Sequence, residues 1–187
     1  MKFKSKNILL LLFLLLNPTV KSAENIYLYK GNFSRTIKIE ELNKFKITKK
    51  PSKKLQNLIK ITNQNSKDLH NILSYKIDVP IKASSRLMNS KIGEVFLNRL
   101  SKVIYPNKIS NSKISIKAIR SGIILSSYKN NEKINLIDFF KEYPNKNIAI
   151  DLDALNKTLK KVDSLKELIY FYSNSPFQKL KEGRSST

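Results

Sequence analysis

The densest hydrophobic patterning lies in residues 87–143, where three stretches repeat apolar residues with the period of a helix. Such spacing predicts three amphipathic helices in a row. The first is capped by Asn89 or Ser90 and ends at Tyr105-Pro106, and the third is capped by Asn135. We expect them to bury Ile92, Val95, Phe96, Leu100, Val103 and Ile104 (first helix), Ile114, Ile116, Ala118, Ile119, Ile123, Ile124 and Leu125 (second), and Leu136, Ile137, Phe139 or Phe140, and Tyr143 (third).

Two glycines lie inside these helices, Gly93 in the first and Gly122 in the second. A glycine inside a helix is less favourable than alanine by about 1 kcal/mol. Glycines at such positions predict that another backbone approaches closely, and one option is that these two helices meet each other there.

The second helix is apolar around much of its circumference, which is typical of the central helix of a bundle. Its one basic edge consists of Lys113, Lys117 and Arg120. Arg120 either pairs with a buried acid such as Asp138 or Asp151, or faces a partner.

Shorter elements flank this block. Residues 26–39 alternate around the turn-forming Lys30-Gly31-Asn32 and predict a β-hairpin. Short helices are expected from Glu40, from about Ser52, from Ser66 and after Pro80, and residues 147–151 (NIAID) predict a strand that extends the hairpin. The predicted fold is therefore mainly α (α+β), a helical bundle with a small β element.

The N-terminus carries Lys2, Lys4 and Lys6 before an uninterrupted apolar run, Ile8 to Leu16. This is the layout of a secretory signal peptide. Cleavage after Ser22 fits best, and an uncleaved membrane anchor is the alternative. We expect a signal peptide over 1–22, a helical domain over 23–153, an amphipathic helix over 154–173 and a polar tail over 174–187, in an exported protein of the periplasm, thylakoid lumen or extracellular space.

The formal charge is +22, and loss of the four signal-peptide lysines would leave +18. Only five of the 36 basic residues are Arg, the side chain that forks onto bases and phosphates, so nucleic acid is a disfavoured partner. Eight lysines without an acid lie between Leu42 and Lys67, namely Lys44, Lys46, Lys49, Lys50, Lys53, Lys54, Lys60 and Lys67. They predict a solvated helix face; the alternative is a footprint for an anionic envelope or membrane surface.

No catalytic constellation emerges from the residues. The chain has no cysteine, a single histidine (His70) and four glycines, no two of which are close enough for the G-x-S-x-G elbow of an α/β hydrolase. Asp151 and Asp153 are more simply helix caps than a carboxylate pair. We therefore expect no enzymatic activity, no metal and no cofactor.

Four segments carry a family resemblance: IYLYKGNFSRTIKIEELNKF, LMNSKIGEVFLNRLSKVI, IKAIRSGIILSSYKNNEKINLIDFFKEYP and IAIDL. Their order resembles a cyanobacterial domain of unknown function that is typically found at the N-terminus of exported α/β hydrolases. The resemblance implies a mostly helical accessory domain before a separate catalytic one, and supplies no catalytic residues. The sequence ends where that hydrolase would begin, so we expect a non-catalytic interaction module; the alternatives are a protein that binds an anionic surface and a subunit of a split hydrolase.

Overall fold

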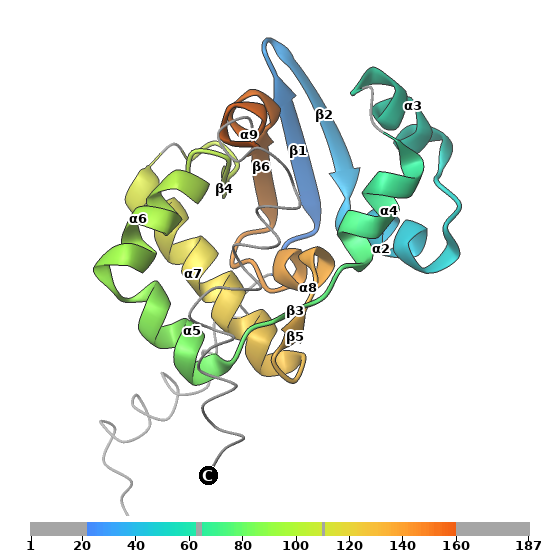
Figure 1. The fold of residues 1–187 in the computed structure, drawn as a ribbon. Helices are drawn as coiled ribbons and strands as arrows, with labels where there is room; N and C mark the ends of the chain where they lie inside the picture. Colours follow the sequence, from blue (N-terminus) through green and yellow to red (C-terminus); the bar gives the residue numbers. More distant parts are fainter. Residues whose placement is uncertain (1–21, 63–64, 110, 160–187) are drawn as a thin grey trace, which may run out of the picture.

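The computed structural model describes residues 22–62, 65–109 and 111–159. Within these ranges, eight helices surround a four-stranded sheet, with a separate two-stranded ribbon (Figure 1). The predicted fold class, mainly α (α+β), is confirmed. Nearly all of the predicted signal peptide, most of the predicted C-terminal helix and the polar tail lie outside the described residues.

The sheet brings together the two ends of the described chain. Strands β1 (Asn25–Lys30) and β2 (Phe33–Lys38) form the predicted antiparallel hairpin, and β6 (Asn147–Asp151) adds to β1 in parallel. Gly31 turns the hairpin at φ +54°, a backbone conformation that glycine adopts without strain. The strand order is β2-β1-β6-β4, so β2 lies at one edge of the sheet.

The fourth strand, β4 (Ile104–Pro106), pairs antiparallel with β6 and was not predicted. The first helix of the central block, α6 (Lys91–Leu100), ends before it rather than running to Tyr105. Ile104 and Tyr105 suit a strand, and Pro106, which has no N–H to donate, is tolerated at a sheet edge. The helical period alone could not show that the chain changes to an extended conformation here.

The remaining elements are α2 (Ile39–Thr48), α3 (Lys53–Ile61), α4 (Ser66–Ser74), β3 (Ile77–Asp78), α5 (Ile81–Met88), α7 (Ser112–Lys129), β5 (Lys133–Ile134), α8 (Leu136–Lys141) and α9 (Leu152–Leu159). Side chains cap several of these helices as their sequences predict. Ser52 accepts from the Leu55 N–H, Ser90 from the Gly93 N–H, and Asn135 with Asp138 forms a reciprocal capping box at α8.

Helix α7 is central, in contact with α5, α6, α8 and β4. The predicted burial of Ile119 is confirmed, but Ile114 and Leu125 are exposed. The buried face instead gathers small residues: Ser115, Ala118, Gly122, Ser126 and Ser127. Small side chains let four neighbours approach one helix, and the apolar residues left over point elsewhere.

The buried serines of α7 satisfy their hydroxyls on nearby carbonyls. Ser115 and Ser126 donate to carbonyls three or four residues back, Asn111 and Ile123, at 3.1 Å and 3.0 Å. Ser127 donates to the carbonyl of Val79, which precedes α5. Because each hydroxyl has a partner, these polar residues can lie in the core without a large desolvation penalty.

The predicted burial is confirmed only in part at α6: Val103, just after the helix, is buried, and Phe96 and Leu100 pack against the core. Leu97 is fully buried and Gly93 is buried, whereas Ile92 and Val95 are exposed, at 77% and 56%. Gly93 lies on the buried side of α6 because α5 packs against the helix at this position.

Candidate functional site

Arg120, on the predicted basic edge of α7, is half-buried, while Lys113 and Lys117 are exposed. Its Nε donates a hydrogen bond of 3.0 Å to the carbonyl of Met88, the last residue of α5. A cation at the negative end of a helix is favourable. Arg120 therefore ties α7 to α5.

Of the two alternatives for Arg120, the structure does not show the first, an ion pair with Asp138 or Asp151. Asp138 accepts from the Asn135 N–H within the capping box, and Asp151 accepts from the Ala154 N–H at 2.8 Å. Asp153 does not cap that helix as expected; it accepts from the Gly31 N–H at 2.7 Å and so holds the hairpin turn. These carboxylates have structural partners.

Both helix glycines lie at close approaches, but with different neighbours rather than with each other. A Cβ on Gly93 would lie 1.8 Å from the carbonyl oxygen of Leu87 in α5. A Cβ on Gly122 would lie 2.9 Å from Cε2 of Phe139 in α8. The first contact is with backbone and the second with a ring, so the two sites differ in how much they can adjust.

His70 lies in α4 and has structural contacts. Its Nε2 is 3.0 Å from the carbonyl oxygen of Lys46, and its ring packs edge-on against Phe45 with centroids 5.9 Å apart. Ser74 lies at 3.4 Å from the same nitrogen. These contacts anchor α4 against α2.

Two tyrosines, Tyr105 and Tyr143, have raised pKa values. Burial raises the pKa of the Tyr143 hydroxyl well above its ordinary value, and that hydroxyl is buried without a hydrogen-bond partner in the part of the chain that the structure describes. Burial, and then the charge of Asp151 and the neighbouring Tyr29, raise the pKa of Tyr105. A raised tyrosine pKa keeps the hydroxyl neutral, which is the opposite of what an activated nucleophile needs.

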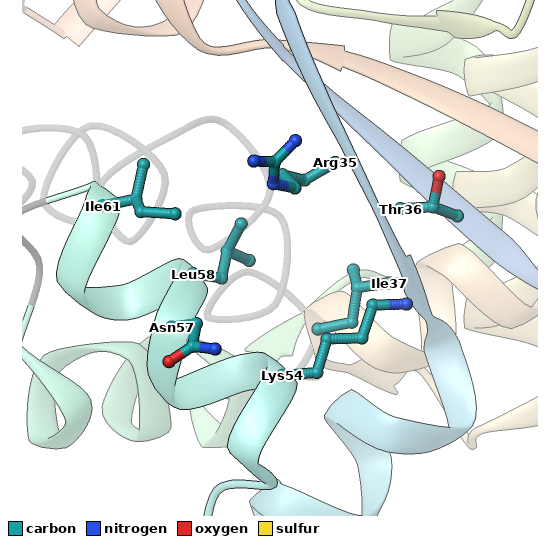
Figure 2. Close-up of a pocket in the computed structure, with 7 residues that line it drawn as sticks. All are labelled: Arg35, Thr36, Ile37, Lys54, Asn57, Leu58 and Ile61. Carbon is teal, nitrogen blue, oxygen red and sulfur yellow. The ribbon is translucent and has the colours of Figure 1, made fainter.

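An open groove lies between β2 and α3, with a volume of about 140 Å³ (Figure 2). Arg35, Thr36 and Ile37 line one side, and Lys54, Asn57, Leu58 and Ile61 line the other. Figure 2 shows that the lining residues of α3 face the strand along one side of the helix. The groove thus has an apolar floor beside two cations.

The cations of the groove lack carboxylate partners among the described residues. Arg35 donates to the carbonyl of its own neighbour, Ser34, at 3.0 Å. The ion pairs in the described parts of the chain, Lys129–Glu142 and Lys146–Glu24, lie elsewhere. Phe33, two residues before Arg35 on the same face of β2, is 75% exposed.

The predicted lysine stretch continues from this groove along α2 and α3. Lys49, Lys50, Lys53 and Lys54 are all exposed, as a solvated helix face requires. Lys49 is the left-handed C-cap of α2, at φ 58°. Among these lysines, Ile47 is 70% exposed, an apolar residue on a strongly cationic surface.

In residues 22–62, 65–109 and 111–159 there is no group of three or more His, Cys, Asp or Glu side chains arranged to hold a metal ion. No helix in the same ranges is long and apolar enough to cross a membrane.

Residues 22–151 match a protein family described as alpha/beta hydrolase of unknown function (DUF1400). The chain belongs to this family. The match confirms the predicted resemblance to a domain of unknown function associated with α/β hydrolases. No curated protein and no solved structure matches the chain.

The groove was missed in the sequence, because its two walls come from separate elements. A partial signal was present: Phe33 and Arg35 lie with Ile37 on one face of the predicted strand. A phenylalanine at a hairpin tip, close to an arginine and followed by a lysine-rich helix, is typical of a surface available for binding.

Proposed function

We propose that this chain is a non-catalytic interaction module of an exported protein, acting beside a hydrolase-type catalytic domain. The observation that supports this most directly is the groove between β2 and α3. It combines exposed apolar side chains, an edge strand and two cations that have no carboxylate partner in the described parts of the chain. Such a combination on a soluble domain is typical of a protein-binding surface.

Two observations argue for a non-catalytic role. The four glycines of the sequence, Gly31, Gly93, Gly122 and Gly183, are too far apart for a nucleophile elbow. The single histidine, which an acyl-transfer enzyme would use as its base, has its Nε2 against the carbonyl of Lys46. The family description therefore fits a domain that accompanies a hydrolase better than the hydrolase itself.

A chromogenic acyl-ester assay on the full chain tests the catalytic part of the proposal. We expect the ester to be hydrolysed no faster than with a lysine-rich control protein that is not an enzyme. Changing any single serine to alanine should leave this rate unchanged. Turnover that one Ser→Ala substitution abolishes would overturn it.

Binding is tested with a hydrolase-type catalytic domain taken from a longer member of the family. Sedimentation velocity of the two proteins, alone and mixed, measures their association. We expect a complex with the full chain that weakens when Phe33 and Ile61 are both changed to serine. An unchanged sedimentation profile on mixing would contradict the proposal.

Export is the part of the proposal that rests on residues 1–22. Their basic start and apolar run are the features that a secretion machinery recognises. Intact-mass measurement of the protein recovered from the native host should show a chain that begins at Ala23. A full-length mass would favour the membrane-anchor alternative.

A second candidate function, binding to an anionic envelope or membrane surface, is favoured by one observation. Ile47 is 70% exposed near the end of α2, close in sequence to the exposed Lys44, Lys49 and Lys50. An apolar residue within a cationic surface suits an anionic bilayer. Sedimentation with anionic vesicles at low and high salt tests it, and binding independent of salt would contradict an electrostatic footprint.

A further inference from the structure

We propose that the edge of β2, together with the groove behind it, binds an extended acidic segment of a partner protein. This inference rests on the proposed interaction role and specifies its ligand. In the arrangement we propose, the segment adds as a strand to β2 and places an apolar side chain against Leu58 and Ile61. Its carboxylates pair with Arg35 and Lys54.

The backbone of β2 has a free edge within the described parts of the chain. The strand is last in the sheet order and pairs only with β1. In a hairpin with a two-residue loop, the pair flanking the loop, here Lys30 and Phe33, exchanges hydrogen bonds. Alternation then directs the backbone groups of Ser34, Thr36 and Lys38 away from β1, where an added strand can reach them.

The side chains beside this edge select the partner's chemistry. Ile37 is buried at the base of the groove, and Leu58 and Ile61 continue the apolar surface along α3. Arg35 and Lys54 are the charged members of the lining, and the lining contains no carboxylate. An apolar side chain flanked by carboxylates is complementary to this arrangement.

Charge also argues against two other occupants. Residues 33–61 contain nine basic and two acidic residues, so the β2 edge of a second copy would bring cations against cations. A bilayer needs a broad surface to lie against, whereas the groove, at about 140 Å³, has room only for single side chains. An acidic segment of a protein fits both the charge and the shape.

Fluorescence anisotropy with a labelled short peptide of alternating valine and glutamate tests the inference on the full chain. The double variant Arg35→Glu/Lys54→Glu reverses the groove charges. The matched control, Lys113→Glu/Lys117→Glu, makes the same charge change on the exposed edge of α7. Thermal melts check that both variants remain folded.

We expect the groove variant to weaken peptide binding by about tenfold or more and the control by less than about threefold. A peptide with lysine in place of glutamate should not bind, and N-methylation of alternate backbone amides should weaken binding by about tenfold. Equal loss in both double variants would overturn the inference and indicate unspecific attraction. Binding that survives N-methylation would exclude strand addition.

Anionic vesicles in the same assay separate a membrane from a protein ligand. Suppose that the peptide fails to bind, whereas the vesicles bind and the Arg35→Glu/Lys54→Glu variant abolishes that vesicle binding. This result would overturn the inference in favour of a lipid surface. If the peptide fails but the hydrolase-type domain still forms a complex, only the acidic segment is wrong. Failure of both removes the interaction role itself.

Discussion

The region around α7 and the edge formed by β2 and α3 use their side chains in opposite ways. Around α7, small residues bring helices together, and every buried serine described above has a carbonyl to donate to. Along β2 and α3, long cations and apolar side chains extend into solvent without partners in the described chain. The first region is complete by itself, and the second is not.

This difference separates basic residues that stabilise the fold from basic residues that are available for binding. Arg120 is basic and lies on a basic edge, yet it bonds to the C-terminal carbonyl of α5. Arg35 is basic and lies at the sheet edge, and among the described residues its hydrogen-bond partner is the carbonyl of the neighbouring Ser34. Substitutions in the first region should therefore change stability, and those in the second should change binding.

The largest expected effect is that of Gly93→Ala. The added Cβ would lie 1.8 Å from the Leu87 carbonyl oxygen, so α5 and α6 must separate. We expect a loss of about 3 kcal/mol or more in the free energy of unfolding, measured by urea denaturation. The control, Gly122→Ala, meets a phenylalanine ring that can shift, and the better helix propensity of alanine offsets part of the clash, so its effect should stay within about 1 kcal/mol. Equal losses would contradict the account of the α5–α6 contact.

Arg120→Met should have the next largest effect. Methionine keeps an unbranched apolar stem but removes the Nε–H donor to Met88. Because the bond involves a charged donor, we expect a loss of about 1.5 kcal/mol in the free energy of unfolding. Lys117→Met, on the exposed part of the same edge, should change it by less than about 0.5 kcal/mol. Similar values for the two variants would show that Arg120 contributes no more than a surface lysine.

Tyr143→Phe should increase stability. The Tyr143 hydroxyl is buried without a hydrogen-bond partner among the described residues, so its removal relieves a desolvation penalty of about 1 kcal/mol. Tyr128→Phe, at a side chain that is 70% exposed, is the control and should leave stability unchanged. A loss of stability in Tyr143→Phe would show that the hydroxyl has a favourable interaction.

The same tyrosine predicts a pH dependence. Burial raises the folded-state pKa above the ordinary value of 10.0, so above that pH the unfolded chain releases a proton that the folded chain retains. The free energy of unfolding should then fall as pH rises, with Tyr143 contributing a slope of about 1.4 kcal/mol per pH unit. Tyr143→Phe should remove this part of the slope, and identical slopes in the two proteins would contradict the raised pKa.

The smallest stability effect is expected at the β2 edge. Phe33→Ser removes a side chain that is 75% exposed, so the free energy of unfolding should change by less than about 0.5 kcal/mol. Peptide or hydrolase-domain binding, measured on the same sample, should nevertheless weaken. Ile92→Ser, 77% exposed on α6, serves as a matched control that should leave binding intact. If both variants weaken binding equally, exposure rather than position determines the interaction.

Local patterns predicted much of this fold. The hairpin, the strand at 147–151, the N-cap at Asn135 and the positions of most helices follow from turn residues, alternation and caps, which act over a few residues. The strand at Ile104 and the exposure of Ile92 and Val95 on α6 did not follow. Both depend on what packs against them, β6 in one case and Leu87 in the other.

The candidate site was less predictable than the fold. The lysines along α2 and α3 were visible as a stretch, but the groove exists only because β2 and α3 lie side by side. The hydrogen-bond acceptor of Arg120 is a backbone carbonyl, and no sequence pattern predicts such a contact. From the sequence alone, Arg120 therefore remained a candidate interaction residue. A carboxylate partner must be an Asp or Glu, which can be seen in the sequence, whereas any residue at a helix C-terminus can supply a backbone carbonyl.

Amide chemical-shift mapping of the isotope-labelled full chain, titrated with the valine–glutamate peptide, tests the central contrast most directly. We predict that the shifted amides cluster in β2 (Phe33–Lys38) and α3 (Lys53–Ile61), while those of α7 around Lys113 and Lys117 stay in place. Shifts centred on α7, or spread evenly over all lysine-rich surfaces, would contradict a specific binding edge at β2 and α3.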